Sequence, residues 1–273
     1  MKVVLFCGGL GMRLREFSEN IPKPLVKIGY RPIIWHLMKY YAHFGHKDFI
    51  LCLGYKADDF KKYFLQYDEC TSNDFTMSEG GSKLELNNSD IHDWRITFVD
   101  TGMNSNIGER LVKVKGYLSN EEMFLANYSD GLTDMNLHEQ LAHFKTYNKI
   151  AGFLSVKPNL SYHAVTSLKN GALVGEMKPF KSCNIRINGG FFILNKDIFN
   201  YINEGEELVL EPFYRLIEKE QLVAYEYEGF WGAMDTFKDK QMLDELYEKG
   251  NPPWQVWNSN NEQKVFRSNG YRT

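Results

Sequence analysis

A glycine-rich turn close to the start of the chain carries residue types that bind phosphate. An apolar run of β-forming residues ends in Gly8, Gly9 and Gly11, and Arg13 and Lys23 follow. Glycine lets the backbone turn sharply with its N–H groups free to face an anion, and the two cations would neutralise that anion. The spacing matches neither the Walker pattern nor the dinucleotide fingerprint. An ordinary strand-to-helix turn also uses glycine, so this segment alone leaves both interpretations open.

Two acidic residues stand where a hard cation could be held. Asp130 follows an apolar run and therefore lies at the carboxyl end of a predicted strand, where open parallel sheets bind ligands. Asp235 stands just before a helix predicted to start near residue 237. Carboxylates at such places suit Mg²⁺. The alternatives are a plain Asp-Gly turn at Asp130 and a helix N-cap at Asp235.

These groups form a coherent set for phosphoryl or nucleotidyl transfer. Amide donors and Arg13 would hold a triphosphate, Lys23 would balance charge in the transition state, and the two acids would bind the metal. Phosphoryl and nucleotidyl transfer need few further groups, so the sequence predicts an enzyme of this type.

Composition excludes several other functions. The chain has 273 residues, 15% aromatic residues and a formal net charge of -3, so it can form a large core but lacks the basic field that non-specific nucleic-acid binding needs. No apolar run approaches the roughly 20 residues of a membrane span, and no signal-peptide pattern opens the chain. We therefore expect a cytoplasmic protein that binds neither nucleic acid nor membrane. The four scattered cysteines predict buried thiols at Cys7 and Cys52, and neither a disulfide nor a zinc site.

Apolar strand-like runs alternate with helical patterns, which predicts a doubly wound, mostly parallel α/β sheet. Pro32 is placed near the start of the first clear helix and Asp134 as the cap of the second. The expected strands are 3–7, 48–53, 95–99, 122–127, 189–194 and 222–228. The expected helices are 32–44, 135–147, 196–203, 208–219 and 237–248.

From residue 150 the pattern changes to closely spaced strand-like runs. Runs at 150–156, 162–168 and 172–176, with a hairpin turn at 169–171, predict a β-rich antiparallel insertion over about 150–188. Such an insertion could lie over one end of the sheet as a lid. We expect one domain over 1–257 and a polar, frayed tail over 258–273.

The combined motifs resemble the sugar-1-phosphate nucleotidyltransferases, in particular their glucose-1-phosphate cytidylyltransferase branch. The likeness runs from about residue 1 to 257 and is far more specific than any single motif. The segments that carry it are Gly8–Leu14, Pro22–Pro24, Trp35–His36, Gly54–Lys56, Val99–Gly102, Gly108–Leu111, Asp130–Gly131, Lys178–Pro179, Asn188–Gly190, Met234–Thr236 and Pro253–Trp254.

The resemblance implies a Rossmann-like sheet with an acceptor-side insertion, and a reaction that joins a nucleoside triphosphate to an acceptor phosphate with release of pyrophosphate. It assigns Arg13, Lys23 and Asp130 to catalysis and Asp130 and Asp235 to Mg²⁺. The loop from Thr101 to Arg110 resembles the cytosine-side element, so CTP is the expected donor. The residues implied to bind nucleotide are Phe6, Gly8, Gly9, Gly11, Met12, Arg13, Lys23, Thr101, Gly108, Arg110 and Asp130.

The expected acceptor residues depart from the family pattern. Lys178 is implied to grip the acceptor phosphate, and Asn188 and Arg186 lie in the same region. His163 stands where sugar enzymes commonly have glycine, and Met177 stands where they carry a glutamate that binds ring hydroxyls. Losing such an acceptor costs about 1–3 kcal/mol per buried partner. We therefore expect an acceptor other than a standard hexose 1-phosphate.

L-glutamine phosphate, giving CDP-L-glutamine, is the candidate acceptor, and glucose 1-phosphate, giving CDP-glucose, is the alternative. Either product would be an activated precursor for capsule or surface polysaccharide. A non-catalytic nucleotide sensor and a glycosyltransferase are weaker alternatives, because the lysine and both acids are present and no Asp-x-Asp pair is. Family members often assemble, so a homo-oligomer is expected.

Overall fold

The apolar run near the start of the chain forms the buried middle strand of the sheet. In the computed structural model, which describes residues 1–9, 21–158 and 162–258, strand β1 (Lys2–Phe6) lies between β4 (Asp48–Leu53) and β8 (Met123–Tyr128) and is parallel to both. Alternate side chains of β1 enter two separate hydrophobic clusters, one on each face of the sheet. A continuous apolar run is what a strand covered on both faces requires.

Among the described residues, the main sheet has eight strands, mostly parallel around β1 and partly antiparallel beyond β8. The path runs β13-β10-β14-β8-β1-β4-β7, and β15 pairs in parallel with β10. This confirms the predicted doubly wound sheet. The remaining strands are β7 (Arg95–Asp100), β10 (Ala151–Val156), β13 (Ile187–Asn188), β14 (Phe192–Asn195) and β15 (Leu222–Tyr227).

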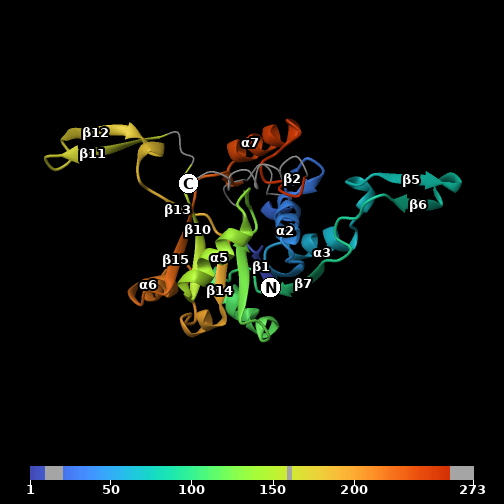
Figure 1. Ribbon diagram of the computed structural model, residues 1–273, viewed down its shortest axis with the longest axis horizontal. Coiled ribbons are helices and arrows are strands. Elements are labelled where there is room, and N and C mark those ends of the chain that lie inside the picture. The colour runs from blue at the N-terminus through green and yellow to red at the C-terminus, as the bar shows by residue number, and fades with distance from the viewer. Residues whose placement is uncertain (10–20, 159–161, 259–273) are drawn as a thin grey trace, which may run out of the picture.

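Helices cover both faces of this sheet (Figure 1). One hydrophobic cluster contains residues of α2, α3, α5 and α7, and the other contains residues of α4 and α6. The sheet is thus the middle of three layers. The helices are α2 (Ile33–His43), α3 (Ala57–Leu65), α4 (Ile107–Lys113), α5 (Leu137–Tyr147), α6 (Glu211–Glu218) and α7 (Phe237–Glu248). The described 3-10 turns are η2 (Lys23–Leu25), η3 (Glu69–Thr71), η4 (Glu79–Gly81), η5 (Lys115–Leu118), η6 (Phe180–Ser182) and η7 (Lys196–Asn200). No helix in the described part of the chain is long and apolar enough to cross a membrane.

One predicted helix cap, Asp134, is wrong, and the N-cap left open as an alternative at Asp235 is not formed. Asn136, not Asp134, caps α5, and Asp134 instead accepts hydrogen bonds from the Tyr227 hydroxyl at 2.6 Å and the Phe230 amide at 2.8 Å. Thr236 caps α7. Asp235 is therefore not the N-cap that its position before a helix allowed.

The β-rich insertion is smaller than expected. β10 and β13 belong to the main sheet, so the part that stands apart is the hairpin of β11 (His163–Leu168) and β12 (Leu173–Pro179). The start near residue 150 was wrong, because composition does not distinguish an antiparallel strand of the main sheet from a separate hairpin. Figure 1 shows this hairpin projecting from the body, so the expectation of a lid over the sheet is also wrong.

A second projecting hairpin escaped the sequence analysis. It consists of β5 (Phe75–Ser78) and β6 (Lys83–Leu86) and lies on the opposite side of the body from β11–β12 (Figure 1). Its register places four exposed apolar residues on one face, and exposed apolar surface of this kind marks contact sites in many proteins. The expected homo-oligomer stays a prediction. The apolar residues are Phe75, Met77, Leu84 and Leu86.

Two short pairs complete the fold: β2 (Lys27–Ile28) with β3 (Arg31–Pro32), and β9 (Gly131–Thr133) with β16 (Trp231–Ala233).

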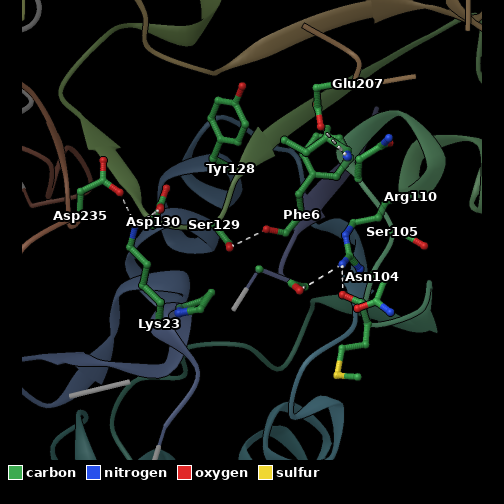
Figure 2. Close-up of a pocket in the computed structure, with 16 residues that line it drawn as sticks. Phe6, Lys23, Asn104, Ser105, Arg110, Tyr128, Ser129, Asp130, Glu207 and Asp235 are labelled. Carbon is green, nitrogen blue, oxygen red and sulfur yellow. Dashed lines mark hydrogen bonds and ion pairs between the residues drawn. The ribbon is translucent and has the colours of Figure 1, made fainter. Parts of the chain in front are cut away.

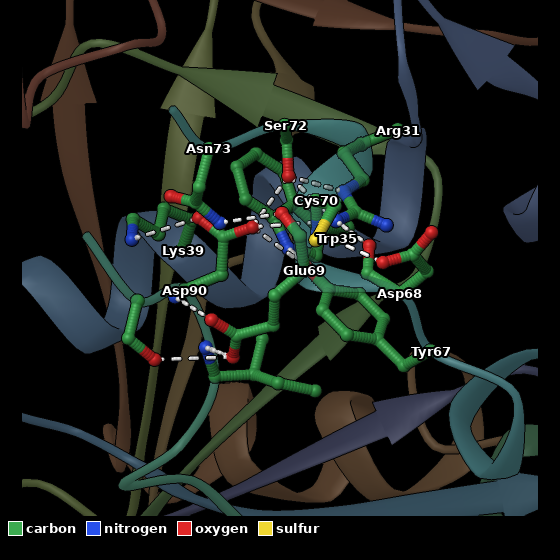
Figure 3. A network of polar contacts seen from close by, with 12 residues as sticks. Arg31, Trp35, Lys39, Tyr67, Asp68, Glu69, Cys70, Ser72, Asn73 and Asp90 are labelled. Atoms are coloured by element: carbon green, nitrogen blue, oxygen red, sulfur yellow. Dashed lines mark hydrogen bonds and ion pairs between the residues drawn. The ribbon is translucent and has the colours of Figure 1, made fainter. Parts of the chain in front are cut away.

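A buried polar network fixes the base of the β5–β6 hairpin to the body (Figure 3). Asp90, on the return segment, accepts hydrogen bonds from the Ser72 hydroxyl at 2.5 Å and the Tyr67 hydroxyl at 2.8 Å. Arg31 reaches the same carboxylate at 3.4 Å and stacks over the Tyr67 ring, 4.0 Å from its centroid. Arg31 and Asp90 are both buried. The hairpin is therefore anchored by a paired charge.

This pairing predicts a large effect of removing Asp90 on stability. Asp90→Ala should lower the free energy of unfolding by about 3–5 kcal/mol, because it leaves the buried Arg31 guanidinium without its carboxylate. Asp93→Ala is the matched control: it breaks the exposed Lys47–Asp93 pair, and such pairs contribute about 0–1 kcal/mol. Urea unfolding followed by circular dichroism measures both. Equal losses in the two variants would contradict the structural role of the network.

Candidate active site

A cavity of about 660 Å³ opens at the carboxyl ends of β1 and β8. From β1 the chain winds through β4 to β7 on one side and then returns to β8 on the other side of β1. The order of strands reverses at this point, and ligands of open α/β sheets bind in the crevice that the reversal creates. The cavity is lined by the turn after β1, by η2, by the loop before α4, and by the segments after β8 and β16 (Figure 2).

Lys23, Asp130 and Asp235, which the sequence pattern assigned to one set of groups, lie together in this cavity. The Lys23 Nζ atom lies 2.5 Å from Oδ2 of Asp130 and 2.6 Å from Oδ1 of Asp235. Figure 2 shows the ammonium pointing at both carboxylates. These residues are far apart in the sequence, so only the fold unites them.

A short β-pair explains why the two acids meet. β9 follows Asp130 directly, β16 precedes Asp235 by one residue, and the two strands pair antiparallel with Ala233 opposite Gly131. The amide of Met234 also donates to the Asp130 carbonyl at 2.9 Å. The pairing therefore places the start of one strand beside the end of the other and brings both carboxylates to the same point.

Asp130 and Asp235 together change the pKa of Lys23 more than its burial does. Burial disfavours the ammonium, but the charges and hydrogen bonds of Asp130 and Asp235 favour it, and the net effect raises the pKa of Lys23. Two neighbouring carboxylate oxygens also fit Mg²⁺, which proteins commonly hold through one or two carboxylates together with substrate phosphates. Asp130 and Asp235 are thus the residues that would hold this ion.

Arg110 holds the glycine turn after β1 in place by a hydrogen bond to the Gly8 carbonyl. Each terminal nitrogen of Arg110 donates two hydrogen bonds. The Nη1 atom donates to the Leu53 carbonyl at 3.0 Å and to the Thr101 hydroxyl at 2.7 Å. The Nη2 atom donates to the Gly8 carbonyl at 3.1 Å and to the Met103 carbonyl at 3.3 Å. A Cβ atom at Gly8 would lie 2.0 Å from Nη1, so a larger residue here would displace the Arg110 guanidinium. The guanidinium therefore links the segments that follow β1, β4 and β7.

Of the other residues predicted to bind nucleotide, some line the cavity and others are buried behind its wall. Phe6, Gly8, Gly9 and Arg110 line the cavity. Thr101 is fully buried behind the wall, where its hydroxyl donates to the Leu53 carbonyl at 2.7 Å. Gly108 is also buried and packs closely against the Glu206 carbonyl. For these two the structure shows a packing role. Gly11, Met12 and Arg13 lie outside the described residues.

The predicted acceptor residues on the hairpin do not converge. In the β11–β12 register, His163 faces Pro179, Ala164 faces Lys178 and Val165 faces Met177. Because side chains alternate across a sheet, His163 and Met177 share one face and Lys178 lies on the other. Lys178 pairs with Glu176 at 3.2 Å. None of these residues lines the cavity, so a shared acceptor site is not formed by this arrangement.

Arg186 and Asn188 lie at the base of the hairpin, closer to the cavity wall. Arg186 meets carboxylates of the chain itself, Glu226 at 3.2 Å and Glu228, and donates to the Ser155 carbonyl at 3.1 Å. Asn188 donates to the Tyr128 hydroxyl at 3.4 Å. Arg186 thus fixes the end of the sheet, and Asn188 contacts a residue that lines the cavity.

Several cavity residues were missed. Tyr128 and Ser129 stand within the motif that ends at Asp130, so their position after a strand was an available signal. Glu207 was not predicted: it precedes α6, and its burial raises the pKa of its carboxyl group. Among the described residues, no group donates to its Oε1 atom. No sequence pattern marks Glu207, because it reaches the cavity through a contact with a distant segment, the start of α4, where the Ile107 amide donates to its Oε2 atom at 3.3 Å. The loop residues that complete the lining are Met103, Asn104, Ser105, Asn106 and Ile107.

Known proteins match this chain over most of its length. The sequence profile of the family described as "Nucleotidyl transferase" matches residues 2–245. The glucose-1-phosphate cytidylyltransferase of Salmonella typhimurium is 38% identical over 258 residues, which cover 94% of this chain and 100% of that protein. A probable glucose-1-phosphate cytidylyltransferase of Bacillus subtilis is 34% identical over 259 residues, with coverage of 94% and 100%.

Solved structures share the fold. A putative glucose-1-phosphate thymidylyltransferase from Bacillus anthracis, in complex with a sucrose, aligns with a TM-score of 0.65 at 16% identity and covers 90% of this chain and 94% of that chain. A UDP-glucose pyrophosphorylase complexed with UDP-glucose aligns with a TM-score of 0.66 at 14% identity, with coverage of 92% and 99%. The profile match and the curated relatives extend over nearly the whole sequence, so this chain belongs to the nucleotidyl transferase family.

Proposed function

We propose that the chain is a cytidylyltransferase that transfers CMP from CTP to a small phosphorylated acceptor and releases pyrophosphate. The observation that carries this proposal is the convergence of Lys23, Asp130 and Asp235 in a cavity that also exposes the glycine turn after β1. The two cytidylyltransferase relatives, 38% and 34% identical over almost their full lengths, support cytidine as the base.

The residues of the cavity have separate tasks in this reaction. An oxygen of the acceptor phosphate forms a bond to the α-phosphorus of CTP, while the bond from that phosphorus to the oxygen of the leaving pyrophosphate breaks. The Gly8–Gly9 backbone would bind phosphate oxygens, and Lys23 would balance the charge that increases on the α-phosphate. Asp130 and Asp235 would hold Mg²⁺, whose contribution is to neutralise triphosphate oxygens.

Glucose 1-phosphate is the acceptor that the comparisons support more directly. The relatives named as glucose-1-phosphate cytidylyltransferases match 94% of this chain over their own whole lengths. The product would then be CDP-glucose, an activated precursor for capsule or surface polysaccharide. The exposed positions of His163 and Met177 weaken the argument against a hexose, because neither lines the cavity.

L-glutamine phosphate is the second candidate acceptor. Its one argument is from the sequence: Met177 stands where sugar enzymes place a hydroxyl-binding glutamate, although Met177 does not line the cavity. This acceptor would give CDP-L-glutamine.

A pyrophosphate-release assay separates the two acceptors. With CTP and Mg²⁺, the wild-type protein should release pyrophosphate on addition of glucose 1-phosphate and form CDP-glucose. Release with L-glutamine phosphate alone would reject the sugar acceptor and leave nucleotidyl transfer standing. No release with either, although CTP binds, would favour the nucleotide sensor.

Removal of Lys23 or Asp130 tests the catalytic assignment. Lys23→Ala should lower kcat by roughly 100-fold or more, because the charge on the α-phosphate loses its balancing ammonium. Asp130→Asn should abolish metal-dependent turnover. Lys27→Ala, an exposed lysine in the neighbouring strand, is the control and should retain wild-type kcat. An unchanged kcat in Lys23→Ala would remove this lysine from the mechanism.

Arg110 acts on the nucleotide through the turn that it holds. Its terminal nitrogens are used by four acceptors within the protein, so its role is to fix the Gly8 carbonyl and thereby the direction of the following amides. Lysine cannot reproduce a planar guanidinium that donates to separated acceptors. Arg110 is therefore a positioning residue in the proposed reaction.

Calorimetry measures this positioning role. Arg110→Lys should weaken CTP binding by about tenfold, which corresponds to about 1.4 kcal/mol. Lys113→Met is the matched control, because Lys113 also bonds the Thr101–Ser105 loop but does not reach the glycine turn. If both variants weaken CTP binding equally, the effect belongs to the loop rather than to the turn.

A further inference from the structure

Lys23 lies where two carboxylates would otherwise face each other. Its Nζ atom is within hydrogen-bond distance of Asp130 Oδ2 and Asp235 Oδ1, and its side chain is only 12% exposed. Asp130 is 24% exposed and Asp235 is 45% exposed, so solvent reaches the cluster from the side of Asp235. The backbone of Lys23 is held between Pro22 and Pro24 in η2. The ammonium is therefore placed by the fold rather than by chance contact of a surface side chain.

The oxygens that Lys23 binds are the ones that a divalent cation would need. Mg²⁺ binds oxygen ligands at about 2.0–2.1 Å and is commonly held by one or two carboxylates. An ammonium bonded to both oxygens fills the space between them, and its positive charge repels a cation placed there. Lys23 and a divalent cation therefore compete for Asp130 and Asp235.

We propose that Lys23 is an internal competitor for the cation site, and that it leaves the two carboxylates when a divalent cation enters with the nucleotide. The inference rests on the proposed function in one respect, namely that Asp130 and Asp235 hold the cation. A lysine side chain has a flexible four-carbon stem, so the ammonium can move while the proline-flanked backbone stays in place. The incoming phosphates supply the negative charge that replaces the carboxylates as partner of Lys23.

The competition has a consequence for the order of binding. While Lys23 neutralises one of the two carboxylate charges, a cation alone gains little by entering. A cation that arrives with a polyphosphate offers Lys23 a new anion at the same time. The three residues thus bind a cation alone weakly and bind the complex of the cation with the nucleotide more tightly. When this complex binds, Lys23 moves to the phosphate whose charge it balances.

Binding of Mn²⁺ to the protein alone tests this directly. Free Mn²⁺ is measured by electron paramagnetic resonance during titration, without nucleotide or acceptor. Lys23→Met should bind Mn²⁺ at least about tenfold more tightly than the wild-type protein. Lys27→Met, which removes an exposed lysine of the adjacent strand, should bind as the wild type does. Adding Asp130→Asn to Lys23→Met should remove the gain.

Two outcomes would overturn the proposal: equal Mn²⁺ affinity in Lys23→Met and the wild type, or a gain that persists in the double variant. Lys23→Gln provides the same comparison if Lys23→Met does not fold, since it keeps a polar group near the carboxylates. A second measurement is thermal unfolding, in which MgCl₂ should raise the Tm of Lys23→Met more than that of the wild type. Because no turnover is involved, failure here is distinct from failure to release pyrophosphate from CTP.

Discussion

The ammonium of Lys23 between Asp130 and Asp235 is the interaction on which the account of the site depends. It joins η2 to the ends of β8 and β16, three segments that the sequence separates widely. Like charges brought so close would repel one another unless a cation lay between them. In the structure Lys23 is a positive partner of both acids, and in the proposed reaction a metal ion takes that place.

The sheet determines where this cluster can form. β1 and β8 are adjacent, parallel and buried on both faces, so their carboxyl ends reach the same edge. The β9–β16 pair then returns the chain from beyond α6 to that edge and brings Asp235 next to Asp130. Arg110 performs the corresponding task on the other side, where it fixes the glycine turn to the ends of β4 and β7. The rigid elements thus place each charged group, and the loops only complete the lining.

Sequence reasoning succeeded where a pattern has one physical meaning. The apolar run of β1 and the acid after β8 predicted a buried strand and an edge site, and both follow from burial and strand direction. It failed at Glu207, which carries no local signal and reaches the cavity only through contacts between distant segments. The β5–β6 hairpin was overlooked, although alternating apolar and polar residues on both sides of Gly80 and Gly81 predict such a hairpin. The acceptor residues failed for a local reason, because Met177 and Lys178 are neighbours in one strand and therefore face opposite ways. The family was recognisable from combined motifs, whereas the residues predicted for the acceptor on β11 and β12 lie on a hairpin that stands away from the cavity.

The most direct test of the central claim is anomalous X-ray scattering from crystals that hold Mn²⁺ and a CTP analogue with a non-hydrolysable bond between its α- and β-phosphates. The account predicts one Mn²⁺ peak in contact with Asp130 and Asp235, with the Lys23 ammonium on a phosphate of the nucleotide. A peak elsewhere, or a Lys23 that still bridges both carboxylates beside the bound nucleotide, would contradict it.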